Sequence, residues 1–251
     1  IAMKNIVVGI DFSPNSENAL RHAIAVAIKS EGTLHLIHVK PQRASSIFSS
    51  KEEQAIAKNI EKGLQQLTED AIREAPMCMV QNVILQGKPP VELLRYAHNL
   101  QDSMIVVGTH GTSGFDEKQV GSNTLRIVSE SKVPVLSVRE NINIGRDLTQ
   151  ILVPIDESFE TLQKIKYAVL FAELFNAKLI LLGTYTSPTR ESKHVINVQL
   201  GHARSMAQKA NVRYEVRTVT ITENPTMALV EYAKHADVNL VIIMREEEAE
   251  F

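Results

Sequence analysis

The chain has 251 residues, of which 44% are hydrophobic and 22% are charged, and its formal net charge is −2. This composition is typical of a globular protein with one large core or two smaller ones, and the near-neutral charge argues against nucleic acid or an anionic membrane as a partner. The apolar runs are far shorter than a membrane span, and the single cysteine, Cys78, excludes internal disulfides, so we expect a cytoplasmic protein.

Five short apolar runs in the first half of the chain predict buried parallel strands. They are almost continuously apolar, as is typical of strands covered on both faces, and they span residues 5–10, 33–39, 79–85, 104–108 and 133–138. Between them, Ser13 and Pro14 form a cap and first-turn pair for a helix. Ile56 and Ile60 begin the apolar stripe of a second, amphipathic helix. This alternation predicts a twisted parallel sheet with helices on both faces.

A second copy of this pattern follows in the other half of the chain. At an offset of 145 residues the first apolar run and its flanks match again, with Asp156 in the place of Asp11. Further along, the offset falls to 136 residues, and Pro225 takes the place of Pro89. A change of offset between two ungapped stretches is expected where a middle helix or loop is shorter in one copy. We therefore predict two related domains in tandem.

We expect the first domain to span residues 3–140 and the second to span residues 150–251, with a linker over residues 141–149. After its last apolar run, the second half shows no counterpart of residues 121–138. The predicted fold is therefore α/β, with two tandem open twisted parallel sheets that have helices on both faces, and the second copy is expected to be incomplete.

The stretch at residues 108–124 is the most informative of the sequence, because it begins where the fourth predicted strand ends. Its candidate ligand-binding residues are three of its glycines and the three polar residues at the start of the next helix, namely Gly108, Gly111, Gly121, Ser122, Asn123 and Thr124. Glycines let the backbone approach a ligand closely. The free N–H groups and the dipole at a helix start favour an anion, and the two hydroxyls could add bonds to phosphate oxygens. The alternative is a flexible surface loop that uses glycine for its turns.

This loop is neither a Walker motif, since no Gly-Lys-Ser/Thr follows, nor a dinucleotide fingerprint, which would follow the first strand. Its context resembles the universal stress protein family, whose ATP-binding members carry Gly-x2-Gly-x9-Gly-Ser/Thr. Four residues match that spacing without a gap, namely Gly108, Gly111, Gly121 and Ser122. Residues 8–13, 36–39 and 134–136 also resemble the family's strands. The resemblance covers the first half and most of the second, and it implies an adenine nucleotide alpha hydrolase-like fold.

By this resemblance the first domain is expected to bind ATP, or AMP or ADP, with or without Mg²⁺. Asp11 would accept hydrogen bonds from the ribose hydroxyls, the backbone of Val39 would contact the adenine, and Gly108 would lie against the ribose. The expected nucleotide-binding residues are Ile10, Asp11, Phe12, Ser13, Val39, Val107, Gly108, His110, Gly111, Gly121, Ser122, Asn123 and Thr124. Asp11 also has a structural alternative as the cap of the following turn, and both roles can coexist.

The second domain departs from this pattern. Met244 aligns with Gly108, and a side chain of that size would occupy the space of the ribose. The acidic residues 246–248 would repel phosphate. We therefore expect this half to bind no nucleotide, to keep Asp156 only as a cap, and to serve as an internal partner of the first half.

No pattern in the sequence assigns catalytic or metal-binding residues. His35 and His38 lie three residues apart on one predicted strand, so they face opposite sides and cannot share a metal ion. His110 lies in the glycine loop, where it could bind a phosphate or approach an attacking water. No Ser-His-Asp or paired-carboxylate spacing is present.

The resulting hypothesis is a cytoplasmic, ATP-binding universal stress protein that acts as a regulatory module, in which nucleotide occupancy biases the loop at residues 108–121. One alternative is a slow ATPase or autophosphorylating enzyme, with Ser122 as a possible acceptor. Another is a nucleotide-free, self-assembling scaffold. The resemblance also implies homo-oligomers, or internal pairing of the two domains, through the strand at residues 133–138.

Overall fold

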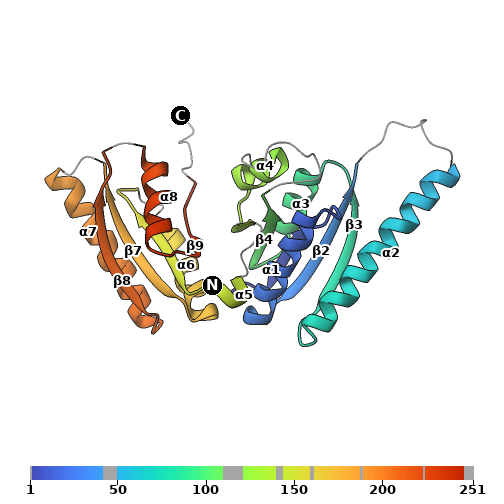
Figure 1. The fold of residues 1–251 in the computed structure, drawn as a ribbon, viewed down its shortest axis with the longest axis horizontal. Helices are drawn as coiled ribbons and strands as arrows, with labels where there is room; N and C mark the ends of the chain where they lie inside the picture. The colour runs from blue at the N-terminus through green and yellow to red at the C-terminus, as the bar shows by residue number, and fades with distance from the viewer. Residues whose placement is uncertain are drawn as a thin grey trace. The chain divides into compact units, whose positions relative to one another are not determined.

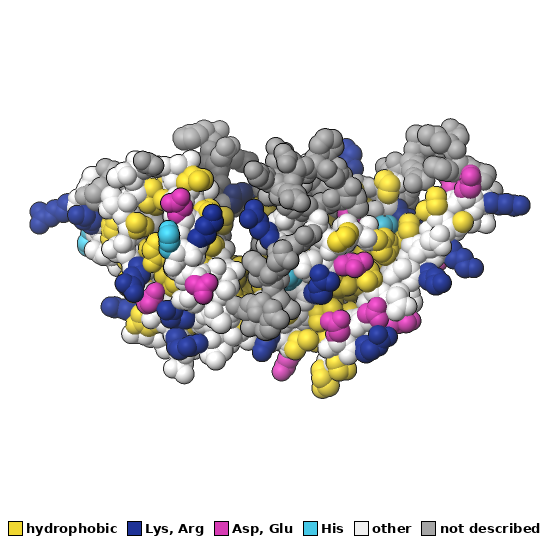
Figure 2. Space-filling model, viewed as in Figure 1, with side chains coloured by type: hydrophobic (Ala, Val, Ile, Leu, Met, Phe, Trp, Pro, Cys, Tyr) yellow, Lys and Arg dark blue, Asp and Glu magenta, His cyan; other side chains and the backbone are white. Residues whose placement is uncertain are grey.

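The computed structural model describes residues 2–41, 50–109, 121–139, 144–158, 161–186, 189–222 and 224–245. The chain divides into two compact units, residues 2–143 and residues 144–251, and each unit has its own parallel sheet. Within the described ranges, no helix is both long enough and apolar enough to cross a membrane. Figure 2 shows Lys and Arg mixed with Asp and Glu on the visible face of each unit, as the near-neutral net charge implies.

The first unit is a five-stranded parallel sheet in the order β3-β2-β1-β4-β5. Its elements alternate along the chain as β1 (Asn5–Gly9), α1 (Pro14–Ser30), β2 (Thr33–Lys40), α2 (Ser50–Glu74), β3 (Val80–Gln86), α3 (Pro89–His98), β4 (Ser103–Gly108), α4 (Ser122–Glu130) and β5 (Val135–Val138). Right-handed crossovers place α1 and α2 on one face of the sheet and α3 and α4 on the other (Figure 1). The predicted helices on both faces are confirmed.

Local capping starts α1 where the sequence predicts. Ser13 is its N-cap, with an extended backbone, and the Ser13 Oγ accepts a hydrogen bond of 3.2 Å from the backbone N of Ser16. Pro14 occupies the first helical turn, where its missing N–H has no consequence. This cap also determines how the chain leaves β1, which matters for the candidate site.

One buried cluster of the first unit lies between the sheet and the helices α3 and α4. Its buried members are Val7, Ile37, Leu93, Leu94, Ala97, Ile105, Val107 and Ile127. The cluster joins residues of β1, β2 and β4 to residues of α3 and α4, so it fixes α4 against the sheet. The candidate site lies next to this cluster.

The second unit is a smaller, four-stranded parallel sheet in the order β8-β7-β6-β9. Its elements are α5 (Ile144–Asp147), β6 (Gln150–Ile155), α6 (Thr161–Phe175), β7 (Lys178–Tyr185), α7 (Arg190–Lys209), β8 (Tyr214–Thr220), α8 (Pro225–His235) and β9 (Leu240–Val241). The helices α6 and α7 contact each other on one face, and α8 covers the other. The predicted linker therefore includes a short helix, α5. Among the described residues of this unit, no strand follows β9.

The two sheets repeat each other in detail. Asn5 pairs with Thr33 and Gln150 pairs with Lys178, so the first pair of strands has the same register in both units. The middle helix has 25 residues as α2 and 20 residues as α7, which accounts for five of the nine residues by which the offset falls.

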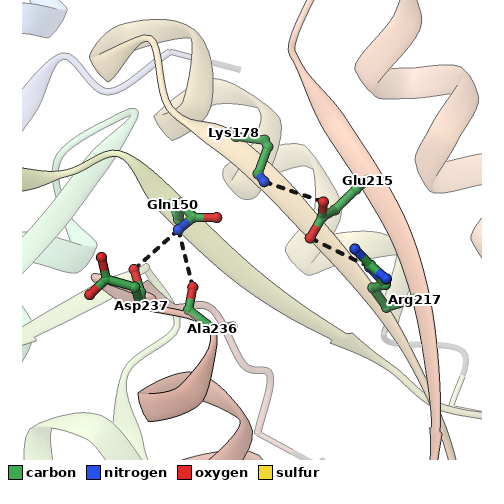
Figure 3. Close-up of polar contacts among 6 residues, drawn as sticks. All are labelled: Gln150, Lys178, Glu215, Arg217, Ala236 and Asp237. Carbon is green, nitrogen blue, oxygen red and sulfur yellow. Dashed lines mark hydrogen bonds and ion pairs between the residues drawn. The ribbon is translucent and has the colours of Figure 1, made fainter.

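A side-chain clamp is also repeated. The Asn5 amide donates a 2.7 Å hydrogen bond to the Gln101 carbonyl, and the Gln150 amide donates to Ala236 at 3.1 Å and Asp237 at 3.3 Å (Figure 3). In each unit, the first residue of the first strand thus holds the turn after the corresponding helix, α3 in the first unit and α8 in the second.

Candidate nucleotide-binding site

The candidate site lies at the carboxyl edge of the first sheet, between β1 and β4. The connection that follows β1 leads to β2 on one side, whereas the connection that follows β4 leads to β5 on the other side. Because these two connections run in opposite directions, a crevice opens between the carboxyl ends of β1 and β4. A pocket of about 170 Å³ occupies it. The predicted residues that line the pocket are Ile10, Asp11, Ser13, Val39, Val107, Gly108, Gly121, Ser122, Asn123 and Thr124.

Three predicted residues are not among this lining. His110 and Gly111 lie outside the described residues. Phe12 has a left-handed backbone, with φ of 61°, and its ring packs 5.2 Å from the ring of His38. The other side of this ring meets Gly63 of α2, where an added Cβ would lie 3.0 Å from a ring carbon. Phe12 therefore anchors the turn after β1 against α2 rather than facing the pocket.

Asp11 is held by the cap of α1. Its Oδ1 accepts hydrogen bonds from the Ser13 backbone N at 3.0 Å and from the Ser13 Oγ at 2.5 Å, and its own N–H donates to the Ser16 Oγ at 3.3 Å. The structural role of Asp11 as a cap is thus present. Among the described residues no group donates to its Oδ2, and the side chain is exposed at the pocket. Asp11 can therefore cap the turn and still accept from a ligand.

The start of α4 forms the opposite wall. Gly121 is its N-cap, with φ of −59° and ψ of 145°, and no side chain caps the helix. The first turn carries no acidic residue, and the side chains of Ser122 and Asn123 are exposed. The N–H groups of this turn and the positive end of the helix dipole thus face the pocket without an internal carboxylate, which is an arrangement that attracts anions.

Two residues of the glycine loop have structural roles that the sequence did not indicate. The Thr124 hydroxyl donates a 2.8 Å bond to the carbonyl of Gly108, so its proton is not available to a phosphate. A Cβ on Gly108 would lie 2.7 Å from the Asn15 carbonyl oxygen, so the close approach of α1 to β4 requires glycine there with or without a ligand. Ser122 is left as the hydroxyl donor of this wall.

The pocket lining combines apolar side chains with polar groups. Ile37, Val39, Pro89 and Leu93 form apolar walls, whereas Asp11, Ser13 and residues 121–124 are polar or backbone donors. The sequence alone does not distinguish the apolar residues Ile37, Pro89 and Leu93 as part of the site, because similar side chains occur in every strand and helix. Their only signal is position, since Ile37 precedes the carboxyl end of β2, and Pro89 and Leu93 lie in the helix that follows β3.

The matching position in the second unit is more enclosed. The Asp156 Oδ1 accepts bonds from the Ser158 N at 3.1 Å, the Ser158 Oγ at 2.5 Å and the Thr161 Oγ1 at 2.7 Å. Burial acts to raise the pKa of Asp156, but the hydrogen bonds from Ser158 and Thr161, with the ammonium of Lys164, lower it overall. Lys164 is itself buried, and this burial lowers its pKa although Asp156 acts against the shift.

These contacts change what the second carboxylate can do. Lys164 aligns with Ala19 of α1, so a buried cation stands where the first unit has a methyl group. Met244 follows β9, where Gly108 ends β4 in the first unit, and residues 246–248 lie outside the described residues. Among the described residues of this unit, the Asp156 carboxylate is bonded internally to Ser158 and Thr161.

A parallel sheet covered on both faces, with a glycine-lined pocket where the strand order reverses, defines an α/β protein with the adenine nucleotide alpha hydrolase-like fold. Residues 3–139 and residues 148–250 each match the Universal stress protein family. The chain belongs to this family and carries its domain twice.

Relatives of known name agree with this assignment. The chain is 28% identical over 156 residues to Universal stress protein MJ0577 of Methanocaldococcus jannaschii, which covers 55% of this chain and 96% of that relative. It is 30% identical over 144 residues to Universal stress protein YxiE of Bacillus subtilis, which covers 53% and 97%. The crystal structure of a universal stress protein from Archaeoglobus fulgidus matches with a TM-score of 0.76, covering 96% of this chain and 84% of that chain at 16% identity, which shows a shared fold.

Proposed function

We propose that the first domain binds an adenine nucleotide, with ATP as the preferred candidate, and that the protein acts as a nucleotide-dependent regulatory module. The observation that carries the proposal is a pocket lined both by apolar side chains and by an uncapped helix start. An adenine nucleotide combines an apolar base face, ribose hydroxyls and anionic phosphates, and this lining offers a partner for each of them.

Each part of the pocket has a role in this proposal. The apolar wall at Val39 and Leu93 packs against the base, and the Oδ2 of Asp11 accepts from a ribose hydroxyl. The N–H groups after Gly121 and the hydroxyl of Ser122 donate to the phosphates. No described lining residue is a lysine or an arginine, so backbone donors supply the attraction for phosphate, together with Mg²⁺ if the nucleotide brings one.

Binding is favoured over hydrolysis by the chemistry of the lining. A general base needs a free acceptor near the attacking water. Asp11 is the only carboxylate among the described lining residues, and one of its oxygens is already occupied by two donors from Ser13. The regulatory role follows if nucleotide occupancy changes the preferred state of the segment between Gly108 and Gly121.

Substitution of Gly121 by valine tests the site directly. The backbone angles of Gly121 suit any residue, and its N–H donates a 2.8 Å bond to the Thr109 carbonyl, so Gly121→Val keeps the fold. The added side chain occupies the phosphate space, and we expect ATP affinity, measured by titration calorimetry with Mg²⁺, to fall by at least about tenfold, or about 1.4 kcal/mol.

Gly201→Val is the matched control, because a Cβ at Gly201 in α7 meets no atom within 4 Å. It should leave ATP affinity unchanged. If Gly121→Val binds ATP as tightly as the unmodified protein, the assignment of the phosphate end is wrong. If the unmodified protein shows neither heat nor a shift in melting temperature with ATP, the nucleotide-free scaffold replaces this proposal.

A further inference from the structure

The strand β8 forms an outer edge of the second sheet. It pairs with β7 alone among the described strands. Its sequence places a carboxylate and a guanidinium two residues apart on one face, at Glu215 and Arg217 (Figure 3). An edge of seven residues with unpaired backbone groups is a template for another strand unless something covers it or blocks it.

The free backbone groups of this edge can be assigned. The carbonyl of Arg213 accepts from the Leu179 N–H at 2.9 Å, and the N–H of Ile221 donates to the Tyr185 carbonyl at 2.7 Å. Along a parallel strand, alternate residues direct both backbone groups to the same side. The backbone N–H and C=O groups of the odd-numbered residues of β8 therefore point to β7. Those of the even-numbered residues point to the open edge.

We propose that β8 is an interface at which a second copy of this chain pairs with the same strand in antiparallel orientation, about a two-fold axis through Val216. In this register Val216 exchanges both backbone hydrogen bonds with its own equivalent. Tyr214 and Thr218 of the partner subunit form the next hydrogen-bonded pair on each side. The two four-stranded sheets would join into one continuous sheet.

The charges of the edge match in the same register. Glu215 lies directly opposite Arg217 of the partner subunit, and the reciprocal pair forms on the other side of the axis. These are non-hydrogen-bonded positions, where facing side chains approach most closely, with Cα atoms about 4.5 Å apart. The Glu215 carboxylate already lies 3.3 Å from the Lys178 ammonium and 3.7 Å from the guanidinium of its own Arg217, so the pair across the axis would share Glu215 with these two cations (Figure 3).

Burial adds a second reason for this register. The side chain of Arg217 is 62% exposed, and Val216 at the proposed axis is 40% exposed. Pairing about Val216 covers this valine with its equivalent. An axis through Thr218 would satisfy the same backbone parity but would set Arg217 opposite Val219 and lose the charge match.

The equivalent edge of the first sheet lacks this complementarity. The strand β3 reads Val-Gln-Asn-Val-Ile-Leu-Gln and carries no charged residue. One of its polar side chains, Asn82, donates a 2.8 Å bond to Thr68 of α2 and is therefore occupied. The inference therefore concerns β8 and is independent of nucleotide binding in the first domain.

Cysteine cross-linking tests the register. In a Cys78→Ser background, which removes the native thiol, the Val216→Cys chain carries one thiol at the proposed axis. Mild oxidation should convert most of it into covalent dimers on non-reducing gels, because facing residues meet the distance for a disulfide. Thr218→Cys in the same background is the control. Its thiol would face Tyr214 of the partner subunit, so the variant should form no covalent dimer and should run as a monomer on the same gels. Equal cross-linking of both variants, or of neither, overturns the register.

Charge reversal tests the interface itself, with molecular mass measured by light scattering during size exclusion. Arg217→Glu sets two carboxylates opposite each other and should halve the mass of the assembly, and Glu215→Arg should do the same with two guanidinium groups. Mixing the two variants restores opposite charges at every facing pair, so the original mass should return in a mixed assembly. A monomeric unmodified chain, an unchanged mass in both variants, or no recovery on mixing overturns the proposal.

Discussion

Asp11 and Asp156 occupy matching positions in the two domains but have different environments. Asp11 uses one oxygen to cap a turn and is exposed at a pocket, whereas Asp156 is half-buried, accepts three hydrogen bonds and has a buried ammonium at Lys164 nearby. The same residue type therefore supports two roles, and the difference comes from its neighbours. A direct comparison of the two carboxylates is possible in one chain.

Asp11→Asn keeps the Oδ1 that caps Ser13 but removes the charge and the second acceptor. We expect ATP affinity to fall by about tenfold, because a hydrogen bond to a charged acceptor contributes about 1.4 kcal/mol more than the neutral replacement. Asp156→Asn is the matched control and should leave affinity unchanged. Titration calorimetry on both variants checks this, and equal affinity for the Asp11 variant and the unmodified protein would leave Asp11 with its capping role alone.

At the scale of elements, a buried polar network links three parts of the first domain. His35 of β2 is 4% exposed, and its ring nitrogens contact the Tyr96 hydroxyl of α3 at 3.0 Å and the Asn5 Oδ1 of β1 at 2.9 Å. The Asn5 amide donates to Gln101, so its Oδ1 faces the histidine and must accept from Nε2–H. In the neutral ring, the Nδ1 atom then accepts from the Tyr96 hydroxyl.

This network predicts a pH dependence of stability. Burial lowers the pKa of His35 below its ordinary value near 6.5, so the unfolded chain binds the proton more readily than the folded one. The contribution of His35 to stability is therefore constant well above pH 6.5, and stability is lost as the pH falls from about 6.5 toward the lower pKa of the folded state. Urea unfolding at pH 7.5 and 5.5 measures the loss.

His35→Ile is the informative variant, because the second domain has Ile180 at the matching position, beside Tyr232. It should reduce the difference in unfolding free energy between pH 7.5 and 5.5, since the titrating group is gone while the volume is kept. The control Tyr96→Phe removes one partner of the network and keeps the titrating group, so it should keep a pH dependence. An unchanged difference in the isoleucine variant would contradict the assignment.

At the scale of the whole molecule, one fold occurs twice with different sites. The first domain combines a pocket with an uncapped helix start, whereas the second binds its carboxylate internally and has an open, charged edge strand. The proposed ligand binding and the proposed self-association therefore concern different domains. Each proposal can be tested with variants that leave the residues of the other unchanged.

Hydrogen exchange should show different responses of the two domains to ATP. ATP at about 100 times its dissociation constant stabilises the state that binds it by about 2.7 kcal/mol. We expect slower exchange in peptides from β1, β4 and α4, and unchanged exchange in peptides from β6 and α6, measured by mass spectrometry with and without ATP. Slower exchange at the turn that contains Asp156 would show that the second domain also responds to the nucleotide.

The sequence by itself predicts the fold and much of the candidate site. Continuous apolar runs place β1 and β2 to within one residue of their ends, since buried parallel strands leave no polar alternation. The cap at Ser13 and the glycine before Ser122 predict where α1 and α4 begin. These signals are local, because a helix start or a strand depends on residues a few positions apart.

Only the tertiary structure decides which partner each group takes. The sequence did not show that Thr124 bonds to Gly108, that Gly108 lies against Asn15, or that Phe12 turns away toward His38. Each contact joins segments that are distant along the chain, and several donors or acceptors of the same type compete for it. Packing selects among them, so the chemistry of the lining follows from the sequence, whereas its orientation follows from the fold.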